Sequence, residues 1–334
     1  MSVEIAKTER WPRLWHSDLP YRFILVSDLD HTMVQNEDAT HAHLLAFDAA
    51  WAGGLGLPSA LVYSTGRSPE LYRKLWHEAP LLTPQVLICS VGSEIFMLCK
   101  EEACADGRGG ALVYRPHAEW AVHLDGGGWD RSKVVAAAGR FPQLKPQAES
   151  EQRPHKVSFR IEGGADAARA VLAELEGALK EACVPAKVIY SGGSDVDILS
   201  ERAGKGMALR FVLDSLEAKG HGWPEAGVQV NGDSGNDAEL FEVPHVVGCV
   251  VVNAHPELRS FAEARTADPG LFQATLPCAG GIAEAMAHFG TRAAFAAAPH
   301  DTARAAAAVT ALADFLTGAV RVSAGAPAAV AVLL

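Results

Sequence analysis

The sequence is poor in cysteine, and the few cysteines it has are scattered. Its 334 residues include six, and no two of them form a C-x-x-C pair. Neither a zinc site nor a disulfide framework is indicated by such spacing. We therefore expect reduced thiols in a cytoplasmic protein.

The sequence also gives no indication of a signal peptide, a membrane span or a surplus of basic residues. The amino terminus, MSVEIAKTERWPRLW, has no apolar core, and the Ala-rich stretch near the carboxyl end is interrupted by Asp314, which disfavours a membrane span. Lysine and arginine number 29 against 40 acidic residues, a formal net charge of -11. This balance argues against nucleic acid or an anionic membrane as partner. An anionic substrate would need a local cation.

Several enzyme signatures are also absent. The sequence contains no G-x-S-x-G elbow, no Walker A motif, no H-E-x-x-H and no G-x-G-x-x-G after a strand. Serine hydrolysis, nucleotide binding and a histidine metal site therefore lack support.

The chain is organised around residues 21–33, YRFILVSDLDHTM. A short apolar run at 23–26 predicts a strand buried on both faces, as in a parallel sheet. Ligands bind beyond the carboxyl ends of such strands, which is where Asp28 and Asp30 follow. Two like charges about 4 Å apart repel by roughly 4 kcal/mol at an effective dielectric constant near 20. We therefore expect a cation beside these two carboxylates.

A second strand and helix repeat this pattern. The strand predicted at 59–63 is followed by STGRSPELY, in which Pro69 suits the first position of a helix. The turn offers the Thr65 hydroxyl, the Gly66 N–H and a helix N-terminus, which together form an anion cradle. Thr65 as an ordinary helix N-cap is the alternative. With a third strand at 85–90, the order predicts a parallel α/β sheet.

The middle of the chain has a different pattern. An alternating strand at 155–161 and an amphipathic helix at 165–182 precede two strands, 186–190 and 196–199, that are joined by a Ser-Gly-Gly-Ser turn. We interpret residues 116–198 as an inserted α+β domain.

The parallel pattern then returns. A helix opens at Gly204-Lys205-Gly206, and a strand at 227–230 ends in NGDSGND. We accordingly assign residues 1–115 and 199–290 to one parallel-sheet domain. We expect the Ala-rich tail, residues 291–334, to be loosely helical or disordered.

Two acidic turns are the strongest functional signal. A D-x-D motif at a strand end is often only a turn or a helix cap. Two such strands in one parallel sheet, however, would bring Asp28, Asp30, Asp233 and Asp237 to the same edge. Converging carboxylates need a hard cation, and oxygen ligands favour Mg2+ over zinc or copper.

Lys205 opposes the helix macrodipole, because it lies in the first turn of its predicted helix. It is either a surface lysine or, between glycines that allow close approach, a phosphate contact. His31 is likewise a general base or simply part of the wall of the site.

Taken together, DLDHT, STGRS, the glycine-flanked lysine and GDSGND resemble the four ordered motifs of the haloacid dehalogenase superfamily, spread here over more than 200 residues. The insertion resembles the α/β cap of its sugar-phosphatase branch. SDLDHTMV, STGRSPELY, LLTPQVLICSVGSEI, LKPQ, EQRPHKVSF and SGGSDVDIL are similar to the sucrose-phosphate phosphatases, over residues 22–289. Two features depart from relatives: Ser194 stands where a lysine is common, and plant members carry a further carboxyl-terminal domain.

The resemblance implies roles that the residues alone leave open, since the sequence cannot distinguish nucleophile from metal ligand. Asp28 would be the nucleophile that forms an aspartyl phosphate, and Asp30 the general acid and base. Mg2+ would be held by the Asp28 carboxylate, the Asp30 backbone carbonyl and Asp233, with support from Asp237. The implied phosphate contacts are Thr65, Gly66, Lys205 and Asn236.

The cap should recognise the sugar, because the core motifs are used for phosphate and metal. Its polar candidates, each of which is equally suited to a solvated surface, are Gln152, Lys156, Ser191, Asp195 and Asp197. The resemblance implies a Mg2+-dependent phosphatase acting on sucrose 6-phosphate. The alternatives are another sugar-phosphate phosphatase, for instance one for a mannosyl or trehalose phosphate, or a non-catalytic partner that docks on sucrose-phosphate synthase.

Overall fold

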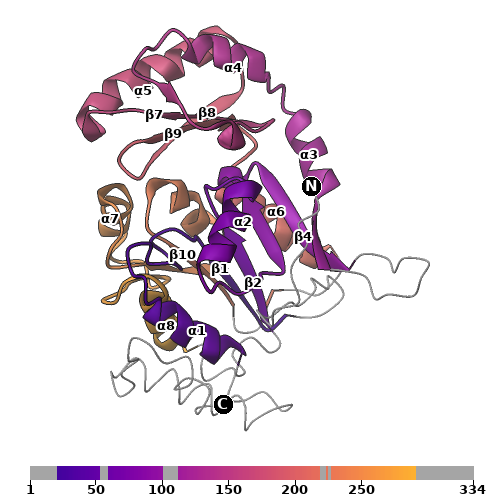
Figure 1. Cartoon of the computed structure of the whole chain (residues 1–334), viewed down its shortest axis with the longest axis vertical. Coiled ribbons are helices and arrows are strands. Elements are labelled where there is room, and N and C mark those ends of the chain that lie inside the picture. The colour runs from indigo at the N-terminus through magenta and orange to yellow at the C-terminus, as the bar shows by residue number, and fades with distance from the viewer. Residues whose placement is uncertain (1–20, 53–58, 101–111, 219–222, 225–226, 291–334) are drawn as a thin grey trace, which may run out of the picture.

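The protein is represented by a computed structural model that describes residues 21–52, 59–100, 112–218, 223–224 and 227–290 (Figure 1). The predictions for the amino-terminal segment and for the tail after residue 290 lie outside these residues. None of the helices in the described ranges has the length and apolar character needed to cross a membrane. The five cysteines within those ranges are free thiols.

An eight-stranded sheet forms the lower part of the molecule in Figure 1. In spatial order its strands are β12 (Leu271–Gln273), β11 (Val246–Val250), β10 (Val228–Gly232), β1 (Phe23–Ser27), β2 (Ser59–Ser64), β3 (Val86–Cys89), β4 (Glu94–Lys100) and β5 (Leu112–Pro116). Neighbours from β12 to β3 are parallel, whereas β4 and β5 pair antiparallel at one edge. The predicted parallel α/β core is confirmed.

Helices cover both faces of this sheet, because successive residues of a buried strand point to opposite sides. Phe23 and Leu25 of β1 pack in a cluster with α1 (Ala42–Ala50), α2 (Pro69–Glu78) and α8 (Cys278–His288). Ile24 and Val26 pack on the other face. The helices of that second cluster are α3 (Ala118–Asp125) and α6 (Lys205–Glu217).

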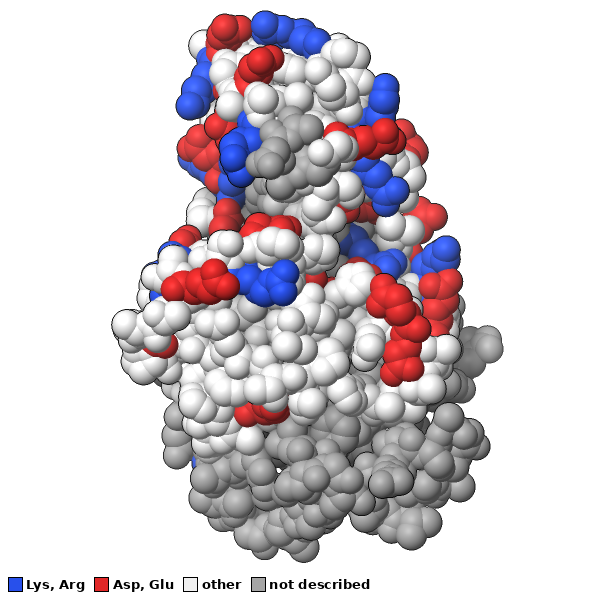
Figure 2. Space-filling model, turned by 90° about the vertical axis from the view of Figure 1, so that its left-hand side faces the viewer, with Lys and Arg blue, Asp and Glu red and all other residues white. Residues whose placement is uncertain are grey.

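A smaller sheet lies above the first. It is wholly antiparallel, in the order β6 (Lys145–Pro146), β7 (Lys156–Arg160), β9 (Asp195–Ser200) and β8 (Ala186–Ser191). The helices α4 (Arg131–Ala138) and α5 (Gly164–Glu181) cover its outer face (Figure 1). The inner face is turned toward the large sheet, and Figure 2 shows a narrowing between the two parts that contains both acidic and basic side chains.

The chain passes from one part to the other beyond the predicted boundary at residue 116. Trp120 and Leu124 of α3 pack in the core of the large sheet, so the first crossing lies at residues 126–128. The second crossing follows β9. Arg202 connects the two crossings, because its Nη1 donates a hydrogen bond of 3.2 Å to the His123 carbonyl oxygen.

A few elements differ from the sequence expectation. Neither α3 nor β12 is predicted, because α3 has a weak apolar period and β12 is only three residues long. The segment that begins within the second acidic turn is a 3-10 helix, η4 (Gly235–Glu242). Two further 3-10 turns, η2 (Ser90–Gly92) and η3 (Glu149–Glu151), follow β3 and β6 in the chain. The helix α7 (Pro256–Glu263) lies between β11 and β12 in the chain.

Candidate active site

The two acidic turns lie side by side. β1 and β10 are adjacent and parallel, with Ser27 in register with Asn231. The Asp28 N–H donates to the Asn231 carbonyl oxygen at 3.1 Å, and the Thr32 hydroxyl donates to Asp233 Oδ1 at 3.0 Å. The expectation that both turns share one edge of the sheet is confirmed.

A buried carboxylate cluster results. One oxygen from each of Asp28, Asp233 and Asp237 lies within 4.8 Å of the others, and all three residues are buried. Lys205 is fully buried between two of them: its Nζ lies 2.7 Å from Asp28 Oδ1 and 2.6 Å from Asp237 Oδ1. Its interpretation as a surface lysine is therefore wrong. The lysine offsets one of the three negative charges.

Local backbone geometry brings Asp237 to this position. Its Oδ2 accepts hydrogen bonds from the N–H groups of Asp233 and Ser234, each at 3.0 Å, as the third residue of a capping box. Gly232 makes room for it, because a Cβ there would lie 2.5 Å from Asp237 Cβ. Both oxygens of Asp237 are thus committed to protein groups.

Burial dominates the electrostatics of the cluster. It raises the pKa of Asp28 to about 7, although Lys205 opposes the shift. Burial and the charges of Asp28 and Asp237 raise the pKa of Asp233 to about 9. Burial would lower the pKa of Lys205, but its two carboxylate partners outweigh burial and raise it. Carboxylates that resist ionisation in this way suit a hard cation, and Asp28 and Asp233 are the members with oxygen atoms to offer it.

Asp30 lies outside this cluster. Its carboxylate accepts two hydrogen bonds of 2.6 Å from Nε and Nη2 of Arg67 and one of 2.7 Å from Nδ2 of Asn36. Burial would raise the pKa of Asp30, but these partners outweigh burial and lower it. The sequence places Arg67 in the right turn but gives no sign of this pairing.

The turn after β2 takes the predicted form. The Thr65 N–H donates to the Ile88 carbonyl oxygen at 2.8 Å, and the Thr65 hydroxyl accepts from the Arg67 N–H at 3.1 Å. The N-cap of α2 is Ser68, whose hydroxyl accepts from the Leu71 N–H, and Pro69 is the first helical residue. Thr65 is therefore not the cap, and the alternative interpretation of this residue is wrong.

A cavity of about 460 Å³ lies between the two sheets. Most of the predicted residues line it, namely Asp28, Asp30, Gly66, Lys156, Ser191, Asp195, Asp197, Asp233 and Asn236. Three predicted residues, Thr65, Lys205 and Asp237, are fully buried and do not line it. The cavity therefore has a core end at the carboxylate cluster and a second end in the smaller sheet.

Gln152 does not line the cavity. Its amide nitrogen donates to the carbonyl oxygens of Ser158 and Gln147, and its amide oxygen accepts from the Ser158 N–H. Its side chain is thus committed to the backbone beside β7, an arrangement that a sequence pattern does not reveal. Glu151 and Gln147 line the cavity instead.

The strand ends of the smaller sheet supply the other cavity residues. Asn236 Nδ2 of the large part donates to the Ser191 hydroxyl at 3.3 Å. Arg160 lies opposite Asp195 on the neighbouring strand, with Nε 3.4 Å from Asp195 Oδ1. Burial, reinforced by the charge of Asp197, raises the pKa of Asp195. Arg160 was not predicted as a cavity residue, although it lies on the same face of β7 as Lys156, which was.

The chain matches known proteins over most of its length. The family model described as sucrose-6F-phosphate phosphohydrolase matches residues 21–290. A sucrose-phosphatase from Nicotiana tabacum is 43% identical over 269 residues, which cover 80% of this chain and 59% of the tobacco protein. A mannosylfructose-phosphate phosphatase from Agrobacterium fabrum is 32% identical, with 80% of this chain and 96% of that protein covered. The chain thus spans about three fifths of the plant relatives it matches.

Solved structures are similar as well. The sucrose-phosphatase of Synechocystis, determined in complex with sucrose and phosphate, matches with a TM-score of 0.65 and 34% identity over 80% of this chain and 98% of its own. A haloacid dehalogenase-like hydrolase from Bacillus subtilis matches with a TM-score of 0.51 and 15% identity, covering 80% of this chain and 94% of its own, which shows a shared fold.

Proposed function

The chain belongs to the sucrose-6F-phosphate phosphohydrolase family, and from that premise we propose that it is a Mg2+-dependent phosphatase that hydrolyses sucrose 6-phosphate to sucrose and phosphate. One observation carries the proposal: Asp28, held by the buried Lys205, opens onto the cavity beside Asp233. The match to a sucrose-phosphatase determined with sucrose and phosphate supports it.

Asp28 is the proposed nucleophile. Its carboxylate attacks phosphorus, the bond from phosphorus to the sugar oxygen breaks, and an aspartyl phosphate forms. Asp30 gives a proton to the departing sugar oxygen and later takes one from the water that releases phosphate. Arg67 lowers the pKa of Asp30 and so favours the ionised carboxylate, which is the form that accepts the proton of the attacking water.

Mg2+, when bound, supplies positive charge between the nucleophile and the phosphate. The Asp28 and Asp233 carboxylates and the Asp30 backbone carbonyl would hold it. Asp237 would support the site indirectly, because its oxygens already fix Lys205 and the N–H of Asp233.

We propose that polar groups around the core end of the cavity bind the phosphate oxygens. These groups are the Thr65 hydroxyl, the Gly66 N–H, Lys205 and Asn236. The Thr65 hydroxyl oxygen already accepts a hydrogen bond from the Arg67 N–H, so its own O–H remains to donate.

The smaller sheet with α4 and α5 is the proposed cap, and its cavity-facing residues Ser191, Asp195 and Asp197 would contact the sugar. Trp120 and Leu124 belong to the core of the large sheet. We therefore place the cap between residue 126 and the end of β9, so that it begins later than the expected first boundary at residue 116. A cytoplasmic location stays a prediction.

Phosphate release from a panel of sugar phosphates, with Mg2+ and with a chelator, tests the proposal. We expect sucrose 6-phosphate to be preferred and the chelator to abolish turnover. The main rival substrate is a mannosylfructose phosphate, because a phosphatase named for it is 32% identical over nearly its whole length. Preference for that ester would overturn the narrower assignment. A chain that hydrolyses no ester would instead favour the non-catalytic partner of the synthase.

A further inference from the structure

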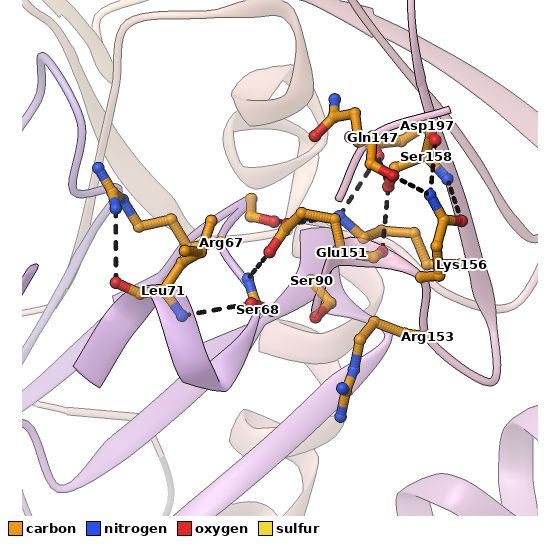
Figure 3. A network of polar contacts seen from close by, with 12 residues as sticks. Arg67, Ser68, Leu71, Ser90, Gln147, Glu151, Arg153, Lys156, Ser158 and Asp197 are labelled. Atoms are coloured by element: carbon orange, nitrogen blue, oxygen red, sulfur yellow. Dashed lines mark hydrogen bonds and ion pairs between the residues drawn. The ribbon is translucent and has the colours of Figure 1, made fainter. Parts of the chain in front are cut away.

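Two side chains of the cap reach across to the turn after β2. Lys156 Nζ donates to the Gly66 carbonyl oxygen at 3.3 Å, and Glu151 Oε1 accepts from the Ser68 N–H at 3.2 Å (Figure 3). Gly66 and Ser68 lie on either side of Arg67, just before α2 begins. Backbone N–H and C=O groups just before a helix need hydrogen-bond partners from outside the helix. Here Lys156 and Glu151 of the smaller sheet's domain provide two of them.

The Lys156 ammonium is surrounded by three protein oxygen atoms. It has three N–H donors and no acceptor. Besides Gly66, its partners are Glu151 Oε2 and Asp197 Oδ1, each at 3.3 Å, and only 2% of its side chain is exposed. Two of its N–H groups thus donate hydrogen bonds to Gly66 and Glu151, and Asp197 completes a shell of protein oxygens around an ammonium that borders the cavity.

The two acids that hold this lysine are themselves fixed. The Ser158 hydroxyl lies 2.6 Å from Asp197 Oδ1, to which it donates, and 3.3 Å from the Glu151 carbonyl oxygen (Figure 3). Both carboxylate side chains are 7% exposed. The ammonium is therefore held from the cap side by partners that do not depend on a ligand.

The peptide between Gly66 and Arg67 is held at both ends. Lys156 binds its carbonyl oxygen, and the Thr65 hydroxyl accepts from its N–H at 3.1 Å. A peptide bond is planar, so fixing the carbonyl oxygen also fixes the N–H that orients the Thr65 hydroxyl. The same segment carries the Arg67 side chain, which binds Asp30.

We propose that Lys156 is a positioning residue for the phosphate site rather than a sugar ligand: through the Gly66–Arg67 peptide, it aims the Thr65 hydroxyl at the phosphate and holds Arg67 against Asp30. This inference rests on the proposed function, because it takes the anion at this turn to be the phosphate of the substrate. The cap thereby takes part in phosphate binding as well as in sugar recognition.

The test compares Lys156→Met with the parent protein on two esters and one inhibitor. The esters are sucrose 6-phosphate and p-nitrophenyl phosphate, which has no sugar hydroxyls, and the inhibitor is inorganic phosphate. Misplaced binding groups cost roughly ten- to a hundredfold. We expect kcat/KM to fall by a similar factor for both esters, and the inhibition constant for phosphate to rise about tenfold. Lys145→Met, at an exposed lysine of β6, is the matched control and should change none of these.

A loss confined to sucrose 6-phosphate, with unchanged phosphate inhibition, would show that Lys156 acts on the sugar and would overturn the proposal. A merely structural role would lower the active fraction and leave the inhibition constant unaltered. A parent protein that cleaves the aryl ester but not sucrose 6-phosphate would refute the proposed substrate alone. If no ester is cleaved, calorimetric binding of phosphate with Mg2+ present replaces kinetics, and Lys156→Met should still bind it more weakly.

Folding of the variant is a separate question, because removing one partner of a buried ion cluster is costly. The double variant Lys156→Met with Asp197→Asn keeps the net charge of the cluster at -1. We expect the same weakening of phosphate inhibition in this variant. Parent-like inhibition in a folded double variant would also overturn the proposal.

Discussion

Arg67 grips Asp30 through two hydrogen bonds of 2.6 Å, one from Nε and one from Nη2, in the bidentate geometry that only an arginine offers. The two residues come from the turns after β2 and β1, so the pair ties the proposed phosphate turn to the proposed general acid. Asn36 adds a third hydrogen bond to the same carboxylate. The proton affinity of Asp30 is thus set by its neighbours.

Replacing Arg67 by Met should raise the pKa of Asp30, because burial then acts with less opposition. We expect kcat/KM at neutral pH to fall at least tenfold, which is about 1.4 kcal/mol of transition-state stabilisation. The limb of the pH–rate profile that reports Asp30 should move to higher pH. Arg210→Met, which breaks an exposed pair on α6, is the control. An unchanged pH–rate profile would show that Arg67 does not set the pKa of Asp30 during catalysis.

Asp28→Asn should abolish turnover, since an amide is a far weaker nucleophile than a carboxylate. Asp30→Ala should lose turnover as well but keep most Mg2+ affinity, because its proposed metal contact is the backbone carbonyl. Calorimetric titration of Mg2+ into both variants checks the difference. Parent-like turnover in Asp28→Asn would refute the nucleophile, and loss of Mg2+ binding in Asp30→Ala would refute the backbone contact.

Gly232→Ala should destabilise the fold and disturb the carboxylate cluster, because the new methyl group would meet Asp237 Cβ at 2.5 Å. Overpacking of this kind costs about 1–3 kcal/mol. Urea unfolding measures the loss. Gly177→Ala in α5 is a matched control with nothing within 4 Å of its new methyl group, and it should stabilise by roughly 0.5–1 kcal/mol. Equal stability for the two variants would contradict the packing argument.

The pair of Arg153 and Glu94 bridges cap and core, with Nε and Nη2 at 2.8 and 2.7 Å from the carboxylate oxygens. Arg153→Met should raise KM for the sugar ester and make it less sensitive to ionic strength, because a partly exposed charge pair is screened by salt. A double-mutant cycle with Glu94→Gln should give a coupling free energy of about 0.5–3 kcal/mol. Additive effects would mean that the two side chains do not stabilise the contact between cap and core.

Asp195 gives a pH dependence of stability. Its pKa is raised in the folded protein by burial and by Asp197, so the folded state binds the proton more tightly than the unfolded chain. Its contribution therefore falls as pH rises from the unfolded pKa, about 3.9, through the raised folded value. Asp195→Asn should be more stable than the parent at pH 7 and gain less at pH 4. Thermal unfolding at both pH values checks this, and a gain that is larger at pH 4 would contradict it.

The core of the fold and of the site was accessible from sequence because both follow from strand order. Apolar runs that stop at Asp28 and at Asp233 predict two parallel strands, and parallel neighbours must present their ends at one edge. The glycine neighbours of Lys205 and its place in the first helical turn marked it as unusual, but its burial between Asp28 and Asp237 was not predicted. These signals are local in sequence and repeat along the chain.

The cap residues were harder because their roles depend on register and on side-chain direction. Gln152 and Glu151 are adjacent, yet one is committed to the backbone of β7 and the other faces the cavity. No pattern in a short polar segment separates them. Similarly, Trp120 falls in the expected insertion but packs in the core of the large sheet. The sequence does not reveal this, because α3 is too short for its pattern to show which sheet it covers.

Arg202 gives the molecule a mechanical property of its own. Its side chain lies against Gly127, where an added methyl group would approach Cδ to 2.9 Å, while its guanidinium binds the last turn of α3. One side chain thereby joins the two connections between the parts. We expect Arg202→Met to loosen this junction and to change the rate of product release in pre-steady-state kinetics, although Arg202 does not line the cavity.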